Sequence, residues 1–98
     1  MTSKPIRAYV LVELRPGKEK DFCEEILKKG LILDSKIERT DFVHGSYDFI
    51  CVINGEIKDI DQRLIKLRTS PHIRKTETLI CFDMFTWEEM SKKVHEEE

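Results

Sequence analysis

Residues 6–14 read Ile-Arg-Ala-Tyr-Val-Leu-Val-Glu-Leu, and residues 47–53 read Tyr-Asp-Phe-Ile-Cys-Val-Ile. In the first segment every second residue is apolar, and this period of two predicts a β-strand with one fully apolar face. The second segment is apolar at both alternating sets of positions, which predicts a strand buried on both sides. A sheet built on these two strands therefore needs cover on both of its faces.

Two helices and two further strands are predicted around these segments. Apolar residues at spacings of three and four predict amphipathic helices over 18–29, ending at Gly30, and over 57–69. A polar segment over 36–43 is typical of an edge strand, and 76–85 predicts the last strand. The apolar stripe of the first helix consists of Phe22, Cys23, Ile26 and Leu27.

The order of these elements predicts an α+β fold of the ferredoxin-like βαββαβ type. Right-handed connections place both helices on one face of an antiparallel four-stranded sheet, with 6–14 and 47–53 in its centre. The other face then carries Tyr9 and Leu11, together with one of the two apolar sides of the segment 47–53, without cover. Leaving three or four such side chains in water costs about 1.5–3 kcal/mol each. We therefore expect a homodimer in which two sheets face each other, a dimeric α/β-barrel-like assembly.

The chain has 98 residues, which is enough for one small domain. We assign residues 1–5 to an N-terminal tail, 6–85 to the ferredoxin-like domain, and 86–98 to a polar C-terminal tail with some helical spacing. We expect neither a signal peptide nor a membrane partner, because no apolar run approaches the roughly 20 residues of a membrane-spanning helix. A formal net charge of −2 also lacks the basic excess of a protein that binds nucleic acid directly.

The cysteines predict the compartment, and the histidines bear on metal binding. The three cysteines are Cys23, Cys51 and Cys81; each lies in an apolar stretch, and none forms a C-x-x-C pair. This pattern predicts reduced, buried thiols and therefore a cytoplasmic location. No metal site or cofactor is expected, because no histidine has a partner at metal-ligand spacing. We also expect no catalytic residue, because Ser46 has no base at a defined offset and no phosphate-binding glycine motif occurs.

The turn His44-Gly45-Ser46-Tyr47-Asp48 is the most informative candidate binding site. Gly45 can adopt a positive φ, and successive amides in such a turn can bind a carboxylate. Asp48 could accept hydrogen bonds from a ligand ammonium group. The alternative is an ordinary turn in which Asp48 bonds nearby backbone amides.

Thr76 and Thr78 form a second candidate at the start of the last predicted strand. They share a face of the strand, and each hydroxyl can both donate and accept a hydrogen bond. The strand order could bring them near the turn over 44–48 across a dimer interface. The alternative is that threonine occurs here for its β propensity alone.

Four motifs together resemble the effector-binding domain of the Lrp/AsnC regulators, which is also called the RAM domain. The resemblance runs from residue 6 to about residue 83. The motifs are Ala8-Tyr9-Val10-Leu11-Val12, Pro16-Gly17-Lys18-Glu19, Val43-x-Gly45-x-Tyr47-Asp48 and Thr76-x-Thr78-Leu79-Ile80.

The resemblance implies a dimer, often assembled into tetramers or octamers, with amino-acid effectors bound near subunit interfaces. Backbone and carboxylate contacts to the effector would then come from Gly45, Ser46, Tyr47 and Asp48, and hydroxyl contacts from Thr76 and Thr78. Family regulators carry an N-terminal helix-turn-helix domain, but only five residues precede the first strand here. We therefore expect a stand-alone module that acts on transcription by assembling with full-length regulators and not by binding DNA.

Two other classes of protein remain open at this point. Small cofactor-free monooxygenases share the βαββαβ dimer, but they need a pocket with a polar group between helices and sheet. The helix-facing residues here read as uniformly apolar, and a pocket lined by His44 or Trp87 would be needed to support an enzyme. The second alternative is an assembly protein without a small ligand.

Overall fold

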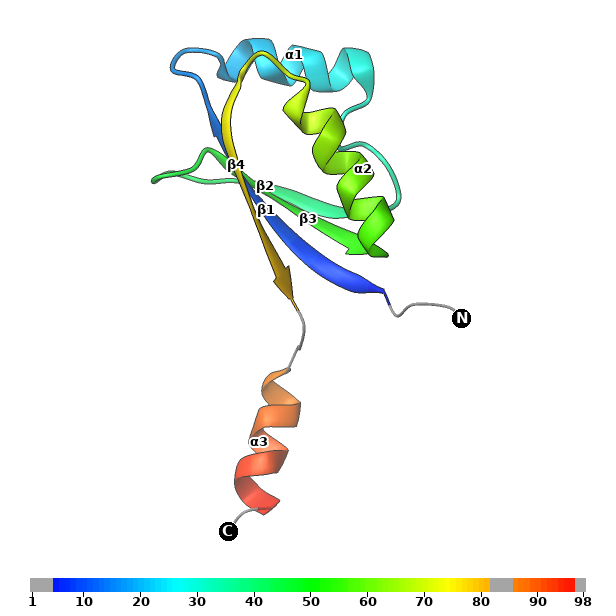
Figure 1. Ribbon diagram of the computed structural model, residues 1–98. Coiled ribbons are helices and arrows are strands. Elements are labelled where there is room, and N and C mark those ends of the chain that lie inside the picture. The colour runs from blue at the N-terminus through cyan, green and yellow to red at the C-terminus, as the bar shows by residue number, and fades with distance from the viewer. Residues whose placement is uncertain (1–4, 82–85, 97–98) are drawn as a thin grey trace.

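The computed structural model describes residues 5–81 and 86–96. Four strands form one antiparallel sheet, and three helices accompany it (Figure 1). In chain order the elements are β1 (Ile6–Leu14), α1 (Glu19–Lys29), β2 (Ile37–Phe42), β3 (Phe49–Gly55), α2 (Ile57–Arg68), β4 (Ile73–Cys81) and α3 (Trp87–Glu96).

The strand order is β2-β3-β1-β4, so the predicted central pair lies in the centre and the polar strand lies at an edge. This confirms the ferredoxin-like fold. β2 is one residue shorter at each end than the predicted 36–43, and β3 ends at Gly55 and not at residue 53. Two strand starts differ by more than one residue. β3 begins at Phe49 because Tyr47 and Asp48 belong to the preceding loop, and β4 begins at Ile73, which pairs with Leu14 beyond a register shift in β1. The predicted strand residues 82–85 lie outside the described residues.

The core lies between the sheet and the two helices α1 and α2, which cover the same face (Figure 1). From β1 the alternate residues Ala8, Val10 and Val12 are fully buried, which confirms the predicted apolar face. Phe22 of α1 stacks on Phe49 of β3, with ring centroids 5.3 Å apart. The remaining buried core residues are Leu14, Ile26, Leu31, Cys51, Ile53, Ile60, Leu64 and Leu67.

The apolar stripe of α1 is narrower than predicted. Phe22 and Ile26 are buried, but the third buried side chain is Glu25, and Cys23 and Leu27 lie on the solvent side. The predictions that Cys23 is a buried thiol and that Leu27 packs in the core are therefore wrong. Successive residues in a helix point about 100° apart, so a helix that buries Phe22 and Glu25 turns Cys23 outward.

The second face of the sheet is covered by neither α1 nor α2. It carries Tyr9, Leu11, Ile50, Val52 and Leu79, whose cross-strand register places them side by side. Leu79 is 49% exposed and Val52 is 2% exposed, and the other three are partly exposed. We call these five residues the open face.

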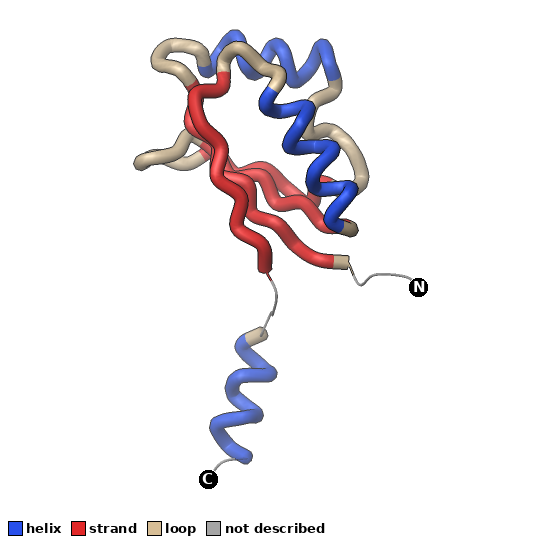
Figure 2. Tube along the Cα trace, viewed as in Figure 1, coloured by secondary structure: helices blue, strands red, loops and turns tan. Residues whose placement is uncertain are grey.

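The helix α3 lies beyond the end of β4, away from the sheet and the other helices (Figure 2). Because the tail forms this helix, its predicted helical spacing is confirmed. The radius of gyration is 16.3 Å, above the value of about 13 Å for a compact domain of about 100 residues. Among the described residues no helix is both long enough and apolar enough to span a membrane.

Candidate functional site

The loop between β2 and β3 is held in place by hydrogen bonds of Asp48, the residue just before β3. Gly45 has φ = 144°, which confirms the predicted positive φ. The backbone N–H of Asp48 donates to the Val12 carbonyl at 2.9 Å, and the Asp48 carbonyl accepts from Val43 N–H at 3.0 Å. The carboxylate Oδ2 of Asp48 accepts from Leu14 N–H at 2.6 Å. Asp48 therefore makes the backbone bonds of the ordinary-turn alternative, which occupy one of its two carboxylate oxygens.

Tyr47 turns from this loop toward β4. Its hydroxyl donates to the Glu77 carboxylate, and Lys75 Nζ lies 5.8 Å from the centroid of its ring. The hydrogen bond to Glu77 raises the pKa of Tyr47 above its ordinary value. Gly45 and Ser46 are exposed at the tip of the loop.

Thr76 and Thr78 lie on the helix-facing side of β4, opposite Val12 and Val10 of β1. Thr76 Oγ1 accepts from Arg68 Nε at 3.4 Å. Thr78 Oγ1 is buried and has no hydrogen-bond partner among the described residues. A buried hydroxyl without a partner is uncommon and points to a missing ligand or water.

Within one chain the backbone of the loop and the two threonines lie on different sides of β1, although the Tyr47 side chain reaches across to Glu77. Phe49, which follows the loop, and Thr76 both pair with Val12 but from opposite sides. Two interstrand spacings, about 10 Å, therefore separate the end of the loop from Thr76. A single chain does not bring the loop and the threonine hydroxyls into contact.

Thr78 instead faces a pocket between α2 and β4, with a volume of about 290 Å³. Its walls are apolar, and it also contains a hydroxyl, a guanidinium and a carboxylate. The lining residues are Ile57, Ile60, Asp61, Leu64, Arg68, Thr78 and Ile80. We call this the α2–β4 pocket. The expectation of a uniformly apolar helix-facing surface is wrong here, because β4 presents Thr78 where a core strand would present an aliphatic side chain.

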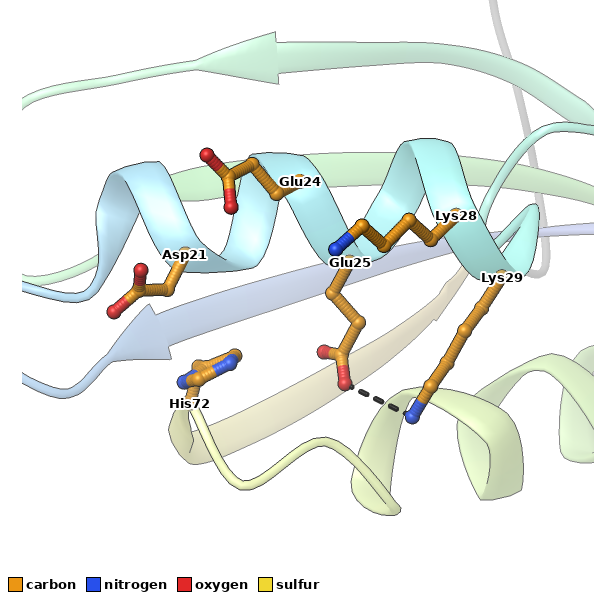
Figure 3. A pocket seen from close by; sticks show the side chains of 6 residues that line it. All are labelled: Asp21, Glu24, Glu25, Lys28, Lys29 and His72. Carbon is orange, nitrogen blue, oxygen red and sulfur yellow. Dashed lines mark hydrogen bonds and ion pairs between the residues drawn. The ribbon is translucent and has the colours of Figure 1, made fainter.

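A second, more polar pocket of about 270 Å³ lies between α1 and the loop before β4 (Figure 3). Glu25 is buried there, where it accepts from the hydroxyl of Ser70 and pairs with Lys29 Nζ at 3.2 Å. Burial acts to raise the pKa of Glu25, but Ser70, Lys29 and the nearby His72 together lower it below its ordinary value. The described residues contain no group of three or more His, Cys, Asp or Glu side chains placed to hold a metal ion.

Sequence reasoning missed Glu25, Asp61 and Arg68. Glu25 had a signal, because it lies three residues after Phe22 on the core side of the helix, where a charged residue is unusual. No feature of the sequence indicated that Asp61 and Arg68 line a pocket, since charged residues on an amphipathic helix are expected to face solvent.

Known proteins match this chain in comparisons with solved structures. Neither the models of known protein families nor the curated proteins match the chain. The crystal structure of FFRP-DM1 is 29% identical, with a TM-score of 0.62 over 79% of this chain and 99% of that one. The hypothetical protein PHS023 from Pyrococcus horikoshii is 28% identical, with a TM-score of 0.61 over 81% of this chain and 92% of that one.

Longer regulators share the fold. AsnC of E. coli is 21% identical, with a TM-score of 0.63 over 83% of this chain and 55% of its own. A feast or famine regulatory protein from M. tuberculosis, solved as a complex with L-methionine, is 17% identical, with a TM-score of 0.61 over 83% of this chain and 52% of its own.

These matches and the βαββαβ topology define the class of the domain: it is a ferredoxin-like domain of the kind found in these regulators. More specifically, it resembles the RAM domain of the Lrp/AsnC regulators, the family that the sequence motifs predicted.

Proposed function

We propose that this chain is an effector-binding regulatory module that binds an amino acid and acts on transcription by assembling with Lrp/AsnC regulators. The main support is Thr78 Oγ1, a buried hydroxyl without a partner that faces the α2–β4 pocket. A net charge of −2 supports action through protein partners and not through direct DNA contacts. Free thiols at all three cysteines are in keeping with a cytoplasmic location.

The chemistry of the α2–β4 pocket suits a zwitterion with an apolar side chain. Arg68 offers a guanidinium, which pairs well with a carboxylate. Asp61 offers an acceptor for an ammonium group, and Ile57 and Ile80 offer apolar contact. The L-methionine complex of the M. tuberculosis regulator supports an amino acid as the ligand class.

The loop residues Gly45, Ser46, Tyr47 and Asp48 enter this proposal through a second subunit. The backbone of the loop lies about two strands from Thr76 in its own chain, although the Tyr47 side chain reaches Glu77 of β4. The loop would therefore contact a ligand held by Thr76 and Thr78 of another copy, one that packs on the helix-facing side of the sheet and not on the open face. The free oxygen of Asp48 would then be available to the ammonium group.

The open face supports a homodimer, which can assemble further into tetramers or octamers. Leu79→Arg introduces a charge on this face and should convert the dimer to monomers in sedimentation at micromolar concentration. Leu27→Arg is the matched control, because Leu27 is exposed on α1 and far from the open face. A wild-type chain that sediments as a monomer would refute the dimer.

The binding experiment is titration calorimetry with each of the twenty amino acids at millimolar concentration. For an amino acid that binds, Thr78→Val should weaken affinity about fivefold, since one hydrogen bond is worth about 1 kcal/mol. The variant should unfold at the same or a higher temperature, because the hydroxyl has no partner to lose. Thr40→Val, on β2, serves as the control with unchanged affinity.

Absence of binding by every amino acid to a folded dimer would refute the effector role and favour an assembly protein without a ligand. We propose no enzymatic activity. The neighbours with known roles are regulators, and the residues that line the α2–β4 pocket include neither His44 nor Trp87.

A further inference from the structure

The helix α3 exposes an apolar stripe. Trp87, Met90 and Val94 recur at the helical spacings of three and four, and they are 80%, 53% and 59% exposed. The helix extends from the end of β4 into solvent (Figure 1). A stripe of this kind on a projecting helix is typical of a segment that packs against another surface.

The same chain carries an apolar groove of matching length. At the mouth of the α2–β4 pocket Ile57 is 63% exposed and Ile80 is 48% exposed. From Ile57 to Leu64 the helix α2 rises about 10.5 Å, and from Trp87 to Val94 the helix α3 rises by the same amount. Stripe and groove therefore fit in length when the two helices lie side by side.

Charges select the antiparallel orientation. The first turn of α3 is acidic, with Glu88 and Glu89, and Lys92 follows one turn later. On α2, Asp61 lies in the first half of the helix and Arg68 ends it. When α3 runs antiparallel to α2, its acidic first turn lies toward the end of α2 that carries Arg68. In the parallel orientation this turn would lie toward the half of α2 that carries Asp61.

We propose that α3 of one chain docks antiparallel to α2 in the α2–β4 groove of a second copy of this chain. The occupant is a second copy because α3 lies away from the groove of its own chain and projects beyond the domain (Figures 1 and 2). The docked helix closes the mouth of the α2–β4 pocket. Docking depends on the exposed stripe and the groove, so it is tested separately from amino-acid binding.

The experiment uses the full chain and the fluorescence of Trp87, which is the only tryptophan in the sequence. Its emission should be shifted to the blue at high protein concentration and should move to the red on dilution. Ile57→Arg blocks the groove and should give red-shifted emission at all concentrations, and Ile80→Arg on the opposite wall should do the same. Leu27→Arg should behave like the wild type. Circular dichroism verifies that each variant is folded.

Mixing two variants tests whether docking occurs between chains. Ile57→Arg keeps its own Trp87 but has a blocked groove, and Trp87→Ser keeps an intact groove but has no fluorophore. The blue shift should return when the two are mixed. The proposal would be overturned if the Trp87 emission were red-shifted at every protein concentration, or if it were blue-shifted at every concentration. It would also be overturned if the blue shift persisted in Ile57→Arg and Ile80→Arg but disappeared in Leu79→Arg.

Discussion

The bond between Asp48 and Leu14 gives the sharpest prediction about stability. The ladder between β1 and β3 ends at the pair Val12 and Phe49, with one more bond from Asp48 N–H to the Val12 carbonyl. The Leu14 N–H of β1 lies beyond the end of this ladder, where β3 offers no carbonyl opposite it. The Asp48 carboxylate takes that place at 2.6 Å, next to a side chain that is only 5% exposed.

Replacing Asp48 by Ala leaves the partly buried Leu14 N–H without this acceptor. A hydrogen bond to a charged group contributes about 1.5–3 kcal/mol, and a buried donor without a partner costs a similar amount. We expect Asp48→Ala to lower the free energy of unfolding by about 2 kcal/mol. Asp48→Asn keeps an acceptor oxygen and should lose less, about 1 kcal/mol.

The assay is urea unfolding at one fixed protein concentration, since a dimer's apparent stability depends on concentration. Asp41→Ala is the control, because its ion pair with Arg39 joins two exposed side chains and should contribute less than about 0.5 kcal/mol. Equal stabilities of Asp48→Ala and Asp41→Ala would refute the structural role of this carboxylate. Asp48→Asn also separates the two roles: a stable variant with weakened amino-acid binding would indicate that the charge contacts the ligand.

Two further predictions concern ionisable groups. The pKa of Glu25 is lowered in the fold, so its stabilising contribution is present above the unfolded pKa of about 4.3 and is lost as pH falls through the folded value. The free energy of unfolding of Glu25→Gln should therefore fall less steeply than that of the wild type below about pH 5. Parallel curves of unfolding free energy against pH would contradict this. Cys23 is exposed, whereas burial raises the pKa of the Cys51 thiol, so a thiol reagent should modify Cys23 in the native protein and Cys51 only on unfolding. A fast phase that persists in Cys23→Ser would show that another thiol is the accessible one.

The fold could be predicted because its apolar pattern is strong where the sheet is buried. The alternation in β1 from Ile6 to Leu14 gives both boundaries of that strand correctly. The start of β3 was placed two residues early, since Tyr47 and Asp48 continue the pattern of a strand but bond to β4 and β1 as loop residues. Periodicity describes which face a side chain occupies and does not reveal such bonds.

The candidate site could be predicted only in part. Thr76 and Thr78 were correctly placed on one face of a strand, but their partner is a helix that the sequence pattern does not position. Arg68 reaches Thr76 because α2 ends beside β4, and that proximity follows from tertiary packing. The loop over 45–48 and the threonines form one binding site only if a second chain is present, as we propose.

The properties of β4 explain why both proposed binding surfaces lie at this edge of the sheet. β1 and β3 supply most of the buried strand side chains, and β4 supplies none that is fully buried. A polar residue such as Thr78 is therefore tolerated on β4, whereas the same residue at Val10 or Cys51 would leave an unpaired hydroxyl in the centre of the core. An edge strand with incomplete cover costs little stability, and it leaves hydroxyl, guanidinium and aliphatic groups accessible to a ligand or to the helix of another chain.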